Sequence, residues 1–334
     1  MNISLSRSDT LNLKGYAVCL LVYYHAVALQ DLSTIPLIEI IIKYSGNVCV
    51  TVFAFLSVYG MCMNLQSCAN ISEHVKYFMH RVARLYISYW RYWITGILIT
   101  ILFVDKNTYS VVYGRGINGV LHLFINAFGL THYFFGYRAY TINPTWWYMS
   151  LALYLIVMTA AIWISWNWKF VKISLLFGYM TVFICVSHNE YLQYTPLIYI
   201  AIVCVKHNSI YFINSKLTYC GATICVGVWL YYRLFCAGPF NCFADALVAY
   251  PIIIIALPIV KRISILQRLG YFSGGIFYIH TLLYSTWPLT HMFIYSISNG
   301  LLIFVKTIAL SVFAVIFIEK IFATICDGIR AVSV

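Results

Sequence analysis

The chain has 334 residues, of which 63% are hydrophobic and 9% charged, whereas soluble domains carry about 25% charged residues. A mean hydropathy of +0.86 excludes a water-soluble globule, a disordered chain and a coiled coil, because such proteins could not hide these apolar atoms from water. The formal charge of +12 could indicate nucleic-acid binding, but long apolar runs confine the basic residues to short loops. We therefore expect a membrane protein with no nucleic-acid partner.

Apolar segments of near-spanning length recur along the whole chain. A transmembrane helix needs about 20 mostly apolar residues. Ten segments approach this length: 13–31, 46–64, 85–104, 145–165, 170–187, 194–206, 217–235, 243–260, 269–289 and 300–318. The sixth is short, and residues 35–44 are apolar but interrupted by Glu39 and Lys43, so either could change the count. The sequence predicts an all-α polytopic integral membrane protein, one domain over 1–334, with about ten spans.

The basic residues predict the orientation, because Lys and Arg gather on the cytoplasmic side of short loops. With the N-terminus inside, fifteen of the 21 fall on that side: Arg7, Lys14, Lys76, Arg81, Arg84, Arg91, Lys169, Lys172, Lys206, Lys216, Lys261, Arg262, Arg268, Lys320 and Arg330. We therefore expect both termini in the cytoplasm. The first apolar run lacks a small-residue cleavage site and is expected to stay in the protein as a helix.

The connection 105–144 is much longer than the links of ordinary helix bundles and is expected on the outer side. Its apolar residues recur at helical spacing: Ile117, Val120, Leu121, Phe124 and Phe128. This pattern predicts an interfacial or re-entrant helix that could cover a site. His122, His132 and Arg138 in the same connection are candidates for binding an acceptor.

The 11 cysteines form no CxxC pair, and most lie in apolar segments, so no metal site is indicated. Cys236 and Cys242 differ from the rest because they flank the turn at Gly238 and Pro239. We place this turn outside, where an oxidising compartment would permit a disulfide.

Lys14 and His25 are candidates for a site inside the first helix. They lie eleven residues apart, which is about three helical turns and a rise of about 16 Å on one face. Ionisable groups within a membrane usually face a bundle interior or a cavity. The alternative is a snorkelling lysine and a histidine bonded to a neighbouring helix, and both interpretations stay open.

A second basic group consists of Arg81, Arg84 and Arg91, which fall within about 80° on a helical wheel. Arg81 and Arg84 could be topological anchors alone. Arg91 lies inside the apolar segment, where facing lipid would be costly. Together with Lys14, these residues could bind phosphate groups from the cytoplasm.

Three further residues are candidates near the outer side. Trp146 and Trp147 open an apolar segment behind Asn143 and Pro144, where they would form an aromatic belt or stack on a sugar ring. His280 lies about as deep as His25 and is expected in a polar network rather than in direct catalysis.

Five motifs occur in order along the chain: 13–17 (LKGYA) with His25, 52–60 (VFAFLSVYG), 81–84 (RVAR), 146–150 (WWYMS) and 273–280 (SGGIFYIH). They resemble the membrane-bound acyltransferase 3 family, in which a basic residue, ten others and a histidine mark the first helix. Lys14 stands where the family usually has arginine, and it lacks the planar fork that grips phosphate twice. Val58 replaces the usual glycine beside Ser57.

The resemblance implies transfer of an acyl group, most simply acetyl from acetyl-CoA, to a hydroxyl of a bacterial surface polysaccharide such as O-antigen, capsule or exopolysaccharide. The enzyme would lie in the cytoplasmic (inner) membrane, among membrane lipids, and the acceptor would be a polysaccharide or a lipid-linked sugar. Lys14, Arg81, Arg84 and Arg91 would hold the CoA phosphates. His25 would be the general base, and an acyl-enzyme through Ser57 or His25 is the alternative.

Two other classes fit the same composition. A polysaccharide polymerase or a lipid-linked glycan flippase would also be basic, aromatic-rich and polytopic, but would need no acyl-CoA. A channel or pump is disfavoured, because the outer half lacks rows of intramembrane carboxylates.

Overall fold

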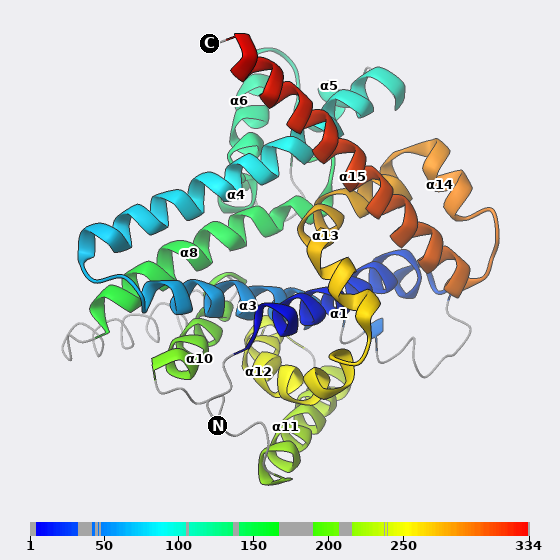
Figure 1. The fold of residues 1–334 in the computed structure, drawn as a ribbon. Coiled ribbons are helices and arrows are strands. Elements are labelled where there is room, and N and C mark those ends of the chain that lie inside the picture. Colours follow the sequence, from blue (N-terminus) through cyan, green and yellow to red (C-terminus); the bar gives the residue numbers. More distant parts are fainter. Residues whose placement is uncertain are drawn as a thin grey trace. The chain divides into compact units, whose positions relative to one another are not determined.

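The computed structural model describes residues 5–32, 42–43, 46, 48–104, 107–135, 140–166, 190–206, 216–236, 238 and 240–332. Within these ranges the chain is helical and contains no strand (Figure 1). It divides into two compact units, which we describe separately. Unit 1 comprises Met1–Leu21, Leu37–Val82 and Ala152–Tyr271, and unit 2 comprises Val22–Pro36, Ala83–Leu151 and Phe272–Val334.

The longer helices are α1 (Arg7–Ala26), α3 (Val48–Leu65), α4 (Ile71–Ile99), α8 (Trp147–Ser165), α10 (Thr195–Lys206), α11 (Lys216–Phe235), α12 (Asn241–Val260), α13 (Ser264–Thr281) and α15 (Gly300–Val332). The shorter α-helices are α5 (Thr108–Val112), α6 (Gly116–Ala127), α7 (Thr131–Phe135) and α14 (Pro288–Ile294). Short 3₁₀ turns are η1 (Ala28–Gln30), η3 (Pro144–Trp146) and η4 (Leu192–Tyr194), and π-helical turns are η2 (Thr100–Val104) and η6 (Leu282–Thr286).

A helix therefore lies on each expected apolar segment that the structure describes, and the expected segment 170–187 lies outside the described residues. Five stretches of the described chain are long and apolar enough to cross a membrane: Val48–Leu65, Ile71–Val104, Pro144–Ser165, Asn241–Val260 and Gly300–Asp327. The others are shorter, as α10 is, or carry more polar residues, as α1 does. The count of ten spans and the cytoplasmic termini stay predictions.

The centre of unit 1 is α3, which packs against α10 and α12, while α11 packs against α12 (Figure 1). Nearly every residue of α3 is buried, including Val52, Phe55 and Met61. A helix that is apolar on all sides is stable only inside a protein core or a membrane. The composition of α3 thus determines its central place.

Two glycines bring α1 and α13 into close contact within unit 1. A Cβ atom added at Gly15 would overlap the carbonyl oxygen of Leu266, and one added at Gly270 would overlap that of Leu11. Small residues let helix backbones approach closely in membrane proteins. The pair fixes where the two helices cross.

In unit 2, α14 and α15 pack against η6. The indole Nε1 of Trp287 donates to Thr100 Oγ1 at 3.1 Å and so joins the end of η6 to η2. Wide π-turns of this kind often mark functional positions in helices. The turn η6 begins two residues after His280.

The long connection contains α6, a helix at the place that the apolar spacing predicts. Ile117, Val120 and Phe124 on it are exposed, and its position at a membrane interface stays a prediction. Buried Asn126 anchors the connection, since its Oδ1 accepts hydrogen bonds from Trp93 Nε1 at 2.7 Å and from Tyr113 Oη at 3.1 Å.

Cys236 and Cys242 are both free thiols in the structure, so the disulfide considered for the turn between them is not formed.

Candidate functional site

Unit 2 brings two histidines from distant parts of the sequence into direct contact. Nδ1 of His25, near the end of α1, lies 2.9 Å from Nε2 of His280 on α13. The two rings stack, with centroids 5.2 Å apart and planes 16° from parallel. His280 is fully buried, whereas His25 is half-buried. Of the two imidazoles, that of His25 is the one a substrate could reach.

The surroundings of His280 assign the protons of the pair. Its Nδ1 lies 2.9 Å from the carbonyl oxygen of Ile276 and 3.1 Å from that of Phe277. Carbonyl oxygens only accept, so Nδ1 of His280 carries the proton and Nε2 of the neutral ring is an acceptor. His25 must then donate from Nδ1, which leaves the lone pair of the neutral His25 ring on Nε2.

A polar network holds the helix that carries His280. Asn143 caps η3 by accepting from the backbone nitrogen of Thr145 at 3.0 Å, and Pro144 occupies the first position of the turn. The Asn143 amide and the Trp146 indole donate to the carbonyl oxygen of Tyr278 at 2.8 and 3.1 Å. The start of the apolar segment 145–165 is thereby bonded to α13 beside the histidine pair.

The two tryptophans expected near the outer side, Trp146 and Trp147, differ in their burial. Trp146 is only 2% exposed and packs edge-on against Tyr89. A side chain so deeply buried and bonded to Tyr278 leaves little surface of Trp146 on which a sugar could stack. Trp147 is half-buried, and its ring centroid lies 6.3 Å from that of His132.

Unit 1 contains two of the four cations of the expected phosphate site, Lys14 and Arg81. Nη2 of Arg81 on α4 donates to Oγ of Ser57 on α3 at 3.0 Å. Lys14 on α1 lies within electrostatic range of Arg81. All three side chains are half-buried. Two cations and a hydroxyl form a donor-rich group of the kind that binds phosphate oxygens.

The arrangement also limits what Ser57 can do. A guanidinium has donors and no acceptor, so Arg81 cannot take a proton from the Ser57 hydroxyl. The observed contact therefore orients the Ser57 hydroxyl for binding phosphate and does not activate it as a nucleophile.

The other two expected cations lie further along α4, in unit 2. Arg84 is exposed and Arg91 is half-buried. The structure thus brings Lys14, Arg81 and Ser57 together in unit 1, and His25 and His280 together in unit 2. Helix α1 carries both Lys14 and His25.

The candidate residues of the outer connection have structural contacts. Nδ1 of His122 lies 2.7 Å from the Tyr113 carbonyl oxygen, and its ring stacks on Tyr140 with centroids 3.7 Å apart. Burial lowers the pKa of His132 below its ordinary value, so this ring is neutral near pH 7. Arg138 lies outside the described residues.

Unit 1 contains a buried ion pair that is not among the residues predicted from the sequence. Nε of Arg233 on α11 lies 3.6 Å from Oδ1 of Asp245 on α12, and the Trp229 indole donates to the same oxygen at 2.8 Å. Opposite charges inside two consecutive apolar segments were the available signal, since a charge in such a segment needs a partner. The polar residues Asn143 and Thr145 beside the histidine pair were also missed as network members.

In the part of the chain that the structure describes, no three potential metal-ligating side chains form a group. No family model, curated protein or solved structure matches this chain.

Proposed function

We propose that the protein is a membrane O-acyltransferase that moves an acyl group, most simply acetyl, from acyl-CoA to a hydroxyl of a surface polysaccharide or lipid-linked sugar. The contact between His25 Nδ1 and His280 Nε2 is the observation that carries the proposal. It is an arrangement in which one imidazole fixes the tautomer of another and leaves the basic nitrogen of the second ring on its other side.

His25 acts as the general base in this proposal. Its Nε2 removes the proton of the acceptor hydroxyl as the hydroxyl oxygen attacks the thioester carbonyl. The new ester bond forms, the carbon–sulfur bond breaks, and the proton passes from Nε2 to the departing CoA thiolate. His280 is a positioning residue, because its Nε2 accepts from the far side of the His25 ring. A neutral imidazole suits this role near pH 7.

The donor would be held by the group of Lys14, Arg81 and Ser57. Their hydrogen-bond donors suit the phosphates of CoA, which arrives from the cytoplasm. Arg84 and Arg91 would add positive charge along the same helix. Helix α1 carries both Lys14, for the donor phosphates, and His25, the proposed base. The resemblance of residues 13–17 and 81–84 to acyltransferase 3 motifs points the same way.

The test is transfer of radiolabelled acetyl from acetyl-CoA by purified protein to extracted surface glycan. His25→Ala should lower the rate by about 10² to 10⁴-fold, the usual contribution of general-base catalysis. His80→Ala is the matched control, because His80 is an exposed histidine of α4 and should leave the rate unchanged. CoA binding by the His25→Ala protein should persist.

His280 supplies a second arm of the same experiment. His280→Gln keeps an oxygen that can accept from His25 Nδ1, so it should retain more activity than His280→Ala, with the loss in kcat and not in KM for acetyl-CoA. Full activity of His25→Ala would refute the base assignment. Label that stays on CoA with every glycan tried would instead support a polymerase or flippase.

A further inference from the structure

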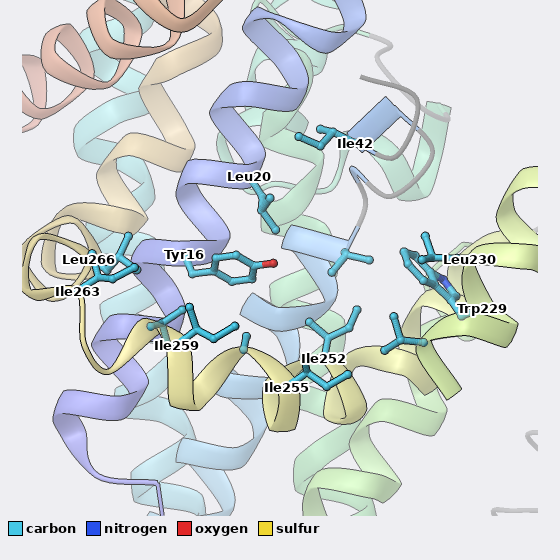
Figure 2. Close-up of a pocket in the computed structure, with 14 residues that line it drawn as sticks. Tyr16, Leu20, Ile42, Trp229, Leu230, Ile252, Ile255, Ile259, Ile263 and Leu266 are labelled. Atoms are coloured by element: carbon cyan, nitrogen blue, oxygen red, sulfur yellow. The ribbon is translucent and has the colours of Figure 1, made fainter. Parts of the chain in front are cut away.

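Unit 1 contains an apolar cavity of about 390 Å³ that plays no part in the proposed transfer reaction. Figure 2 shows Tyr16 and Leu20 of α1 on one side, with Ile252 and Ile255 of α12 below them. The lining includes the Trp229 ring, whose indole nitrogen donates to Asp245. Trp229 therefore presents carbon to the cavity, and the Tyr16 hydroxyl is the polar group that points into it (Figure 2).

The cavity is lined by a helix of spanning length. Ile252, Ile255 and Ile259 line it from successive turns of α12, over a rise of about 10 Å. This helix lies within one of the five stretches that are long and apolar enough to cross a membrane. A chain lying in the cavity would run parallel to α12, which is how the acyl chains of a bilayer run beside a spanning helix.

One end of the cavity is bordered by positive charge. Val260 and Ile263 line this end, and the two residues between them are Lys261 and Arg262. Arg262 is exposed, and Lys261 Nζ lies 3.6 Å from Asp9 Oδ1 with its side chain 46% exposed. Two cations thus lie in the chain directly after α12, between residues that line the cavity.

The apolar lining and the neighbouring cations together limit which molecules could occupy the cavity. An apolar cavity gives water too few hydrogen-bond partners to be stably filled by it. Its volume lies near the lower end of the range for small-molecule sites, so it could not take a helix of another protein. A single apolar chain with an anionic group at one end fits both the lining and the charge, and anionic lipids attract Lys and Arg at the cytoplasmic leaflet.

We propose that this cavity binds one acyl chain of an anionic phospholipid, whose phosphate lies against Arg262. The ester carbonyl of the lipid accepts a hydrogen bond from Tyr16. The site goes beyond the acyltransferase reaction, and its test measures bound lipid and not acyl transfer.

The experiment reconstitutes the full chain in vesicles of equal phosphatidylglycerol and phosphatidylcholine, extracts it in mild detergent and weighs the retained lipid by native mass spectrometry. Ala256 lines the cavity, so Ala256→Phe fills it, while Ala309→Phe places the same ring on an exposed position of α15 as a control. Arg262→Gln removes the head-group charge, and Lys216→Gln removes another exposed cation, at the start of α11.

The wild-type protein and both controls should retain phosphatidylglycerol in preference to phosphatidylcholine. Ala256→Phe should retain about tenfold less of either lipid, since the apolar burial is lost. Arg262→Gln should retain lipid without preference for either head group. If Ala256→Phe fails to fold, the head-group preference of Arg262→Gln still tests the proposal. Unchanged lipid in folded Ala256→Phe, an unchanged preference in Arg262→Gln, or a free fatty acid in place of phospholipid would overturn the proposal.

Discussion

Arg81 and Arg84 lie one turn apart on α4, yet their surroundings differ. Arg81 is half-buried and donates to Ser57, whereas Arg84 is exposed. An exposed cation is screened by salt and contributes little to binding, while a charged hydrogen bond in a partly buried group contributes about 1.5–3 kcal/mol. The two arginines should therefore differ in how much they contribute to binding of CoA.

We predict that Arg81→Gln weakens binding of CoA about tenfold to a hundredfold, and that Arg84→Gln weakens it much less. Isothermal titration of the purified protein with CoA measures both. The loss in Arg81→Gln should be larger at low ionic strength, because screening already reduces the wild-type attraction at high salt. Equal affinities in wild type and Arg81→Gln would leave both arginines as topological anchors.

The sequence alone predicts the helix face on which single residues lie, but not which residues they contact. Helical spacing put Lys14 and His25 on one face of a helix that the structure contains. The partner of His25 is 255 residues away in the chain, and the partner of Arg81 is 24 residues away on another helix. Such contacts depend on how helices pack, which no local pattern determines.

Helix α4 shows what the apolar pattern detected and what it missed. The apolar segment begins near residue 85, but the helix begins at Ile71. Asn70 Oδ1 accepts from the Glu73 backbone nitrogen at 2.9 Å, and Glu73 Oε2 accepts from the Ala69 backbone nitrogen at 2.8 Å. This reciprocal pattern resembles a capping box, a sequence signal that the search for apolar segments does not use. Ser6 and Asp9 form a similar pair at the start of α1.

The close crossing of α1 and α13 depends on the absence of a side chain at Gly15. Gly15→Ala should destabilise unit 1 by about 1–3 kcal/mol, because the added Cβ meets the backbone of Leu266 and the helices must separate. Gly221→Ala on α11 is the matched control, since nothing lies within 4 Å of its added Cβ and alanine favours a helix by about 0.5–1 kcal/mol. Thermal unfolding in detergent measures both. A Gly15→Ala protein as stable as wild type would show that the two helices do not need this close contact.

For the whole molecule, the sequence predicted where helices lie because apolar runs of spanning length have few alternatives to a helix in lipid. It could not settle which of them cross. Helix α10 has 12 residues, fewer than a membrane usually requires, yet it packs against α3 in unit 1. A short helix can be held by such packing without spanning the bilayer. The parity of the spans must therefore come from the basic residues.

The side of the membrane on which each terminus lies tests whether the number of spans is even or odd. Positive-inside asymmetry predicts that both termini lie in the cytoplasm, which requires an even number of spans, and the ten-span prediction counts the segment 170–187 among them. Alkaline phosphatase, which is active only outside, should be inactive when fused after Ser67 or at the C-terminus, and active when inserted after Gly114, between α5 and α6. Green fluorescent protein at the C-terminus should fluoresce. An active C-terminal phosphatase would mean an odd number of spans. Lys14 and Arg81 could then still lie on the same side of the membrane as the N-terminus. The basic residues of α15 would lie on the outer side, against the positive-inside rule.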